Sequence, residues 1–300
     1  MAPFPGQSPG ANTGPGKLPF PTREETILPL NLARGFKTRL VGPDPASAAI
    51  SHRFLYEGPD AALEYEVTAG EAGWGPMAVR LGGKEVAKAL AGAGLVFERP
   101  LEGARLEKVE VEGDALHGVW RGTLGKDEVV VESRVRFWQK SLVVDYACRG
   151  GFAKELSYGR VAGVERPELV LLPYLNYGGH HLNVLLSRGL TPFFASVWMD
   201  PYRSSASVPY AEDKIDGSVD RADVRLNGGV RYHPRTDGKR NDLFERVFVT
   251  FSPVFEDVLP SIPNPPAKGG KEAGTRLWQE SWGPEDYARE HERSKRLRAY

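Results

Sequence analysis

The chain has few of the residues that would point to a particular chemistry. Among its 300 residues there is a single cysteine, Cys148, so no internal disulfide can form. Cys148 lies in a strand-like apolar run, where a small buried thiol is expected rather than a nucleophile. Cysteine usage therefore indicates neither a redox compartment nor a thiol enzyme.

Long apolar runs and net charge are also missing. No run approaches the ~18 apolar residues of a membrane span, and no basic stretch with an apolar core opens the chain. We therefore expect a soluble chain without a signal peptide, extracellular or periplasmic only if a signal was removed. Lys and Arg together number 39, as do Asp and Glu, so nothing favours nucleic acid or a membrane as partner.

Sequence motifs for common cofactors are absent as well. There is no glycine-rich phosphate loop, no dinucleotide fingerprint after a strand and no Gly-x-Ser-x-Gly turn. The acids between 212 and 223 lack the register of a calcium-binding EF-hand loop and read as a solvated loop. We therefore expect no cofactor and no metal, and we set phosphoryl and hydride transfer aside.

What the chain does have is a succession of strand patterns. Apolar and polar residues alternate in segments such as 62–70, 107–112 and 127–138, and turn signals such as Gly113-Asp114 separate them. This pattern predicts a mainly β fold, a large antiparallel β-sandwich with a C-terminal α-helix, rather than βαβ units. In the first part of the chain, only the stretch 84–94 has helical character, although its alanine and glycine content also suits a connection of small residues.

Proline and glycine mark the expected domain boundaries. Residues 1–25 read as a Pro/Gly-rich flexible leader, 26–260 as the β-sandwich domain and 261–283 as a Pro/Gly-rich linker. Residues 284–300 begin with a proline and two acids and continue with strong helix formers, which predicts a terminal helix.

The stretch from Leu169 to Tyr210 is the candidate functional segment, because it mixes strand-like runs with aromatic, amide and histidine side chains. Aromatic rings stack on the apolar faces of sugars, and a neighbouring carboxylate accepts their hydroxyl hydrogens. The stretch thus predicts a sugar-binding surface. The residues expected to contact the sugar are Trp198, Asp200, Tyr202, His180, His181, Tyr177 and Asn176.

Plainer interpretations stand beside this one. Asp200 precedes Pro201 and could simply cap a turn at a strand end, and Trp198 could be partly buried. His180 and His181 would need a third metal ligand such as Asp200 or His233, and adjacent residues of a strand point to opposite faces. A metal site there is therefore disfavoured.

Several segments together resemble a known architecture. These are FWQKSLVVDYACRGG, LLPYLNYGG and FFASVWMDPYRSSAS, followed by a proline linker, WGPEDYA and the basic SKRLRAY. The arrangement over residues 26–300 resembles the galactose-mutarotase-like β-supersandwich that precedes the (β/α)8 catalytic barrel of large glycoside hydrolases. The resemblance implies a supersandwich that lines one side of a sugar cleft and leads into a catalytic barrel. Mutarotases use a histidine and a glutamate, but no motif aligns His181 or Glu245 with them.

The expected function is therefore a non-catalytic carbohydrate-recognition and support module of a glycoside hydrolase-like protein. Its partners would be a carbohydrate and a following (β/α)8 domain, whose catalytic carboxylates lie outside this chain. One alternative is a sugar epimerase or polysaccharide lyase-like enzyme that uses a histidine and an acid. Another is a structural or adhesive surface module without a small ligand.

Overall fold

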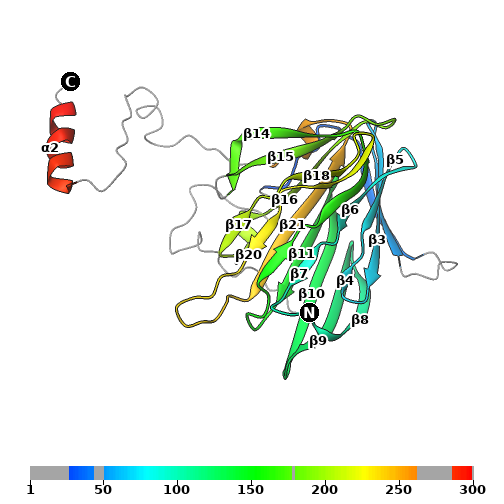
Figure 1. The fold of residues 1–300 in the computed structure, drawn as a ribbon. Coiled ribbons are helices and arrows are strands. Elements are labelled where there is room, and N and C mark those ends of the chain that lie inside the picture. Colours follow the sequence, from blue (N-terminus) through cyan, green and yellow to red (C-terminus); the bar gives the residue numbers. More distant parts are fainter. Residues whose placement is uncertain (1–26, 44–50, 178–179, 262–285, 299–300) are drawn as a thin grey trace. The chain divides into compact units, whose positions relative to one another are not determined.

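The computed structural model describes residues 27–43, 51–177, 180–261 and 286–298, and for 173–181 only the backbone pairing is described. The described residues fall into two units that divide between 263 and 264. Among the described residues, the first unit consists mainly of β-strands, and the second contains one α-helix (Figure 1).

One antiparallel sheet of the first unit has nine strands. Its order is β1-β2-β3-β5-β6-β13-β19-β18, with β4 paired to β3. The strands are β1 (Lys37–Val41), β2 (Ser51–Glu57), β3 (Ala62–Gly70), β4 (Gly73–Trp74), β5 (Met77–Leu81), β6 (Lys84–Ala91), β13 (Arg160–Glu165), β18 (Lys214–Gly217) and β19 (Arg221–Arg225).

The second antiparallel sheet has eight strands in the order β14-β15-β16-β21-β11-β10-β9-β8. They are β8 (Glu102–Glu112), β9 (Ala115–Leu124), β10 (Asp127–Trp138), β11 (Ser141–Cys148), β14 (Pro167–Tyr177), β15 (His180–Ser187), β16 (Phe193–Met199) and β21 (Leu243–Ser252). A four-stranded sheet, β17-β20-β12-β7, joins β7 (Gly94–Val96), β12 (Glu155–Ser157), β17 (Val208–Tyr210) and β20 (Gly229–Arg231). Two 3₁₀ turns, η1 (Pro201–Arg203) and η2 (Glu256–Val258), flank β16 and β21.

The main core lies between the large sheets. Successive strand residues point to opposite faces, so on β21 Val247, Val249 and Phe251 face the main core, where they join Phe54 and Tyr65 of the nine-stranded sheet. The predicted mainly β fold with large antiparallel sheets is confirmed.

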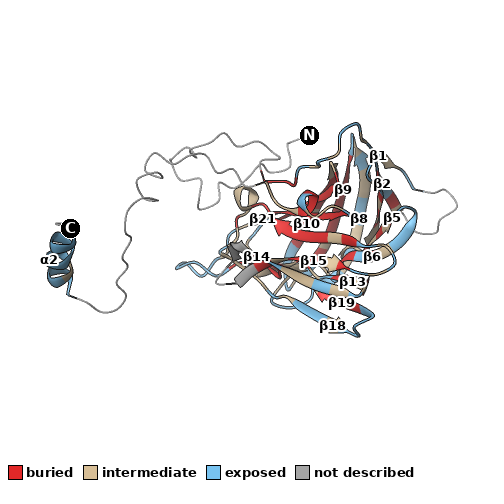
Figure 2. Ribbon diagram, turned by 90° about the horizontal axis from the view of Figure 1, so that it is seen from above, coloured by how far each residue is buried: buried red, intermediate tan, exposed pale blue. Residues whose placement is uncertain are grey.

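The opposite, outer face of the eight-stranded sheet carries a second apolar cluster. Phe248 of β21 and Trp198 of β16 pack there with Leu28, which precedes β1, and Val258 of η2. The Ser261 N–H also donates to the Ile27 carbonyl at 3.0 Å, so the first and last described segments of this unit meet. Because both faces are covered, every residue of β11 is buried, and the central strands are mostly buried in Figure 2.

A buried lysine links the β10–β11 turn to the β2–β3 turn and to η2 at one end of the sandwich. Lys140, in the β10–β11 turn, is 2% exposed. Its ammonium donates to Asp60 of the β2–β3 turn and to Asp257 of η2, and to the Ser252 hydroxyl at 3.0 Å. The lysine therefore neutralises two carboxylates that come from distant parts of the chain.

The helical expectation for 84–94 is wrong. Residues 84–91 form β6, which pairs with β5 and β13, and 94–96 form β7. Ala87 and Ala89 face the main core, where pairing on both sides of β6 overrides the helix preference of alanine.

The second unit is the helix α2 (Tyr287–Leu297), within the predicted helical segment. The Asp286 carboxylate caps it by accepting the Ala288 N–H at 2.9 Å, and no residue of the helix is buried. The predicted leader 1–25 and nearly all of the linker 261–283 lie outside the described residues. Among the described helices, none has the length and apolar content to cross a membrane.

Candidate functional site

The segment Leu169–Tyr210 forms part of the eight-stranded sheet, and its tryptophan is inside the protein. Trp198 is 1% exposed in the outer apolar cluster, and its ring N–H donates to the Val258 carbonyl at 3.1 Å. A ring in this position offers no face to a sugar. The predicted stacking role of Trp198 is therefore wrong, and its alternative as a buried residue fits.

Asp200 caps a turn at the end of β16, which was the alternative role indicated by its position before Pro201. It is the N-cap of η1, where its side chain accepts the Tyr202 N–H at 2.9 Å, and it is 1% exposed. Burial raises the pKa of this carboxyl to about 6. Tyr202 is half-buried beside it. The sugar contact predicted for Asp200 does not fit, since its side chain does not reach the surface.

The remaining predicted residues lie in the β14–β15 hairpin. Asn176 pairs with His181, and Tyr177 pairs with His180. The side chains of these four residues lie outside the described part, so their predicted sugar contacts stay predictions. His233, the other proposed metal partner, is exposed after β20.

Glu245 is a second acid with a raised pKa. It lies on the inner face of β21, where its Oε1 accepts hydrogen bonds from the Tyr232 hydroxyl and, at 3.0 Å, from the Ser204 hydroxyl. Burial raises the pKa of this carboxyl to about 8. At 3% exposure the group has no contact with a dissolved substrate, so its role is structural.

A row of charged side chains crosses the outer face of the eight-stranded sheet. Strand register places Glu110, His117, Arg134, Asp145 and Arg246 opposite one another on five neighbouring strands. At the β11–β21 end of the row, Arg246 donates to both carboxylate oxygens of Asp145, at 2.6 and 2.8 Å, and both residues are buried. The opposite charges of this two-bond ion pair neutralise each other inside the protein, whereas the β8–β9 end of the row is partly exposed.

A cleft of about 340 Å³ lies on β6, β13, β19 and the turn between β15 and β16. Three cations line it, Lys84, Lys88 and Arg221. Within the described residues, no carboxylate forms an ion pair with any of the three. The two acids of the cleft are both engaged, because Glu165 accepts the Leu190 N–H at 3.0 Å and Glu85 lies 3.8 Å from Arg80. The cleft therefore has positive charge to offer to a ligand.

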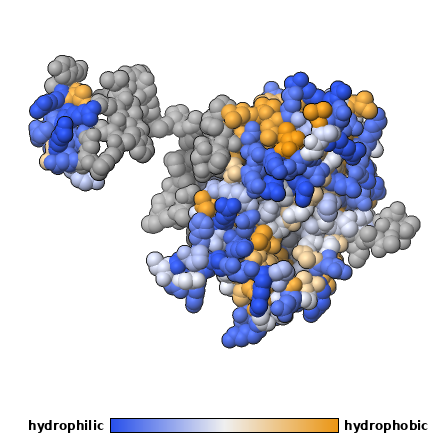
Figure 3. All heavy atoms as spheres, in the orientation of Figure 1, coloured by the Kyte–Doolittle hydropathy of each residue, from blue (hydrophilic) through white to orange (hydrophobic). Residues whose placement is uncertain are grey.

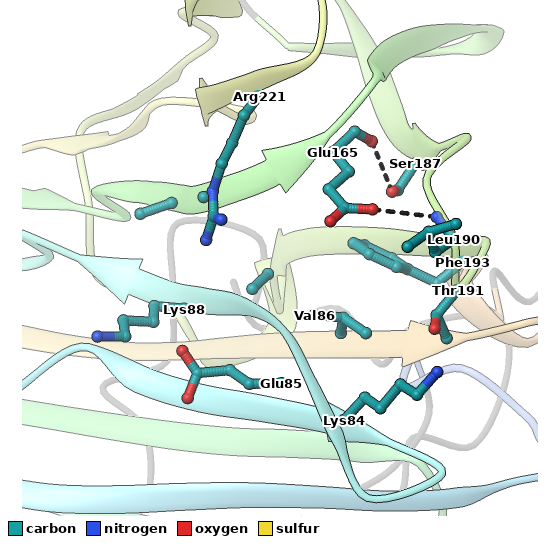
Figure 4. Close-up of a pocket in the computed structure, with 13 residues that line it drawn as sticks. Lys84, Glu85, Val86, Lys88, Glu165, Ser187, Leu190, Thr191, Phe193 and Arg221 are labelled. Atoms are coloured by element: carbon teal, nitrogen blue, oxygen red, sulfur yellow. Dashed lines mark hydrogen bonds between the residues drawn. The ribbon is translucent and has the colours of Figure 1, made fainter.

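Figure 4 shows how these side chains are arranged. Arg221 and Lys88 lie toward the left of the view, Val86 lies near its middle, and Lys84, Thr191, Leu190 and Phe193 lie toward the right. Hydroxyls of Thr191 and Ser187 also line the cleft, so cationic, hydroxyl and apolar groups occur together.

Two strand irregularities shape the cleft. The β5–β6 pairing shifts between Val79 and Arg80, and the β13–β19 pairing shifts between Val161 and Val164. Bulges of this kind re-aim side chains and are common beside binding sites. In the second bulge Gly163 has a φ of +74°, and a Cβ there would lie 3.1 Å from the Arg221 guanidinium. The glycine lets the arginine lie close to the backbone.

Two other hollows are weaker candidates. A cavity between the sheets, lined by Trp74 and Trp120, has a volume of only about 40 Å³. A surface hollow of about 310 Å³ on β8 and β9 contains Arg121, but Glu107 and Glu128 already pair with its guanidinium. The face of the molecule drawn in Figure 3 is mostly hydrophilic, with its main apolar group near the top of the view.

The sequence pointed to part of this cleft but not to its charged residues. Ser187, Leu190, Thr191 and Phe193 belong to the predicted stretch, whereas Lys84, Lys88, Glu165 and Arg221 do not. No local signal marks these four, because only the strand order β6-β13-β19 brings them together.

Comparisons with protein-family models, with curated proteins and with solved structures found no match to this chain. The resemblance to galactose-mutarotase-like proteins therefore remains a hypothesis that rests on the quoted sequence segments.

Proposed function

We propose that this chain is a carbohydrate-recognition module and that its cleft binds an acidic saccharide, such as a uronate or a sulfated sugar. The observation that carries the proposal is the set of cations, Lys84, Lys88 and Arg221, that line the cleft without a carboxylate partner among the described residues. Its volume of about 340 Å³ lies at the lower end of the ~300–1,000 Å³ typical of small-ligand sites.

The lining supplies the contacts that an acidic sugar requires. A guanidinium binds a carboxylate or sulfate through two parallel hydrogen bonds, and a lysine ammonium adds a mobile point charge. Thr191 carries a hydroxyl that matches the polarity of a sugar ring, and Val86 and Leu190 offer apolar surface to its C–H groups. Lys84, Lys88 and Arg221 are exposed, so salt weakens their attraction for an anion.

Binding is favoured over catalysis by the positions of the acids. Asp200 and Glu245, which have raised pKa values, are 1% and 3% exposed and do not line the cleft. The acids that do line it, Glu85 and Glu165, are engaged with Arg80 and with the Leu190 N–H. An epimerase or lyase function would instead depend on His180 and His181. Unchanged turnover in His180→Ala and His181→Ala variants of an active preparation would remove that alternative.

Isothermal titration of the whole chain tests the proposal. The probes are oligomers of galacturonate and a neutral oligosaccharide of equal length, each at low and high salt. We expect binding heat with the acidic oligomer only, and we expect this heat to fall at high salt. Arg221→Gln should bind the acidic oligomer at least tenfold more weakly. The matched control is Arg39→Gln, an exposed arginine of β1 paired with Glu57, which should bind as the unmodified chain does.

Two results would overturn the proposal. One is the absence of binding to any charged or neutral oligosaccharide, which would favour a structural or adhesive surface module. The other is binding that Arg221→Gln and Arg39→Gln weaken equally, since the effect would then come from overall charge. The wider hypothesis, that the module precedes a (β/α)8 catalytic domain, is tested by the reading frame: continuation past Tyr300 into alternating strand and helix patterns supports it.

A further inference from the structure

The β8–β9 hairpin brings a histidine and two glutamates together on the outer face of the eight-stranded sheet. The turn at Gly113-Asp114 pairs Glu112 with Ala115 and Glu110 with His117. Alternation places Glu110 and Glu112 on the same face of β8, and directly paired residues lie ~5 Å apart at their Cβ atoms. The three side chains therefore converge through strand register alone.

Their ligand atoms are spaced like those around a metal ion. One oxygen of each carboxylate and a nitrogen of His117 all lie within 4.8 Å of one another. The His117 Nδ1 lies 3.6 Å from the Glu110 Oε1 and 2.9 Å from the Glu112 Oε1. Ligand atoms ~2.1 Å from a tetrahedral ion are about 3.4 Å apart. Small side-chain rotations would bring the observed spacing to that value.

The other ring nitrogen of His117 faces a third carboxylate. The Nε2 lies 3.5 Å from the Glu132 Oε2 of β10. Metal-binding histidines generally direct their second nitrogen at a carboxylate or carbonyl, which fixes the tautomer and orients the ring. In this structure the Nδ1 forms a hydrogen bond with the Glu112 Oε1 at 2.9 Å, so a metal ion would take the place of the Nδ1 proton. Glu132 would then accept the proton of Nε2 and keep the Nδ1 lone pair directed at the ion. This partner is a separate observation from the two acidic ligands.

We propose that Glu110, Glu112 and His117 form a binding site for Zn²⁺, with Glu132 as the positioning residue for the imidazole. One nitrogen and two carboxylate oxygens are ligands that zinc accepts, and water would complete a tetrahedron. Lys108 occupies part of this space, since its ammonium lies 2.5 Å from the Glu110 Oε1, so zinc must displace it. The site, on β8 and β9, shares no residue with the saccharide cleft and is independent of the proposed function.

Zinc titration of the intact chain by calorimetry, with Mg²⁺ as the comparison ion, tests this assignment. We expect saturable binding of one Zn²⁺ per chain at this site and no comparable heat with Mg²⁺, which favours an octahedral shell of oxygens. His117→Ala and Glu112→Gln should each weaken zinc binding at least tenfold. Lys108→Met should strengthen it, because the competing cation is gone.

His233→Ala, which removes an exposed histidine elsewhere, is the matched control and should bind zinc unchanged. Circular dichroism checks that each variant keeps its β-sheet content, and Glu112→Gln preserves shape if His117→Ala fails to fold. The proposal is overturned if no saturable zinc binding occurs, or if binding survives in Glu112→Gln and is lost in a His180→Ala/His181→Ala double variant. It is also overturned if the substitutions change only the free energy of unfolding, since Glu110, Glu112 and His117 would then be an ion-pair cluster.

Discussion

Lys140 offers a sharp test of how the sandwich is held together. Lys140→Met keeps most of the side-chain length but removes the ammonium that Asp60 and Asp257 share. Asp257 is 1% exposed, so its carboxylate would stay buried with its cationic partner gone. Removal of one partner from a buried ion pair costs about 3–5 kcal/mol. We expect a loss of that size in the free energy of unfolding, a large part of the ~5–15 kcal/mol typical of a domain.

Urea unfolding followed by tryptophan fluorescence measures this loss, with the midpoint and slope fitted together. Lys126→Met, an exposed lysine in the β9–β10 turn, is the matched control and should change stability by no more than about 0.5 kcal/mol. In Lys140→Met/Asp257→Asn the uncompensated charge is removed, so part of the stability should return. A loss below 1 kcal/mol in Lys140→Met, or no recovery in the double variant, would refute the reasoning.

Three further predictions concern single side chains. Glu245→Gln should flatten the pH dependence of the free energy of unfolding. Burial raises the pKa of Glu245 to about 8, from an unfolded value near 4.5. The stability that the neutral carboxyl contributes is therefore complete below the unfolded pKa and is lost as the pH rises toward 8 and above. Urea midpoints at pH 5 and pH 9 measure this, and equal slopes against pH in both proteins would contradict it. Trp198→Ala should cost about 3–5 kcal/mol in urea unfolding because it empties a buried position, and a cost below 1 kcal/mol would mean that the ring is not in the core. Gly163→Ala should weaken acidic-saccharide binding by displacing Arg221. Gly82→Ala, also at positive φ but with nothing near the added Cβ, should lower only the free energy of unfolding. Equal saccharide binding in the two variants would argue against the arrangement of the cleft.

The strands could be predicted where local alternation and a short turn fix their register. Alternation on 127–138 and the Gly113-Asp114 turn predict long antiparallel strands, and both occur as β10 and the β8–β9 hairpin. The pairing of Glu110 with His117 follows from that turn by counting residues. No metal-ligand motif marks this pair in the sequence, whereas the adjacent His180 and His181 are conspicuous there.

The site predictions failed where burial depends on distant segments. Phe194, Ser196 and Trp198 share one face of β16, and their mixed polarity is typical of a strand face that is partly solvated. The face is covered instead by η2, from more than fifty residues later, and by Ile27 and Leu28. Nothing in the sequence of 193–202 indicates that distant segments bury this face of the strand. The charged lining of the cleft was unpredictable for a related reason, because register shifts in two strand pairs position it.

The hydrogen bond between Ser261 and Ile27 has an engineering consequence. The sandwich unit enters and leaves at neighbouring points, so a host protein could carry it as an insertion in a surface loop without stretching its own backbone. The same proximity allows a circular permutant, in which a short linker joins 261 to 27 and new termini open in the exposed turn at 235–239. Such a permutant would keep every strand pairing of the sandwich while moving β21 and η2 from the last part of the unit to be synthesised to the first.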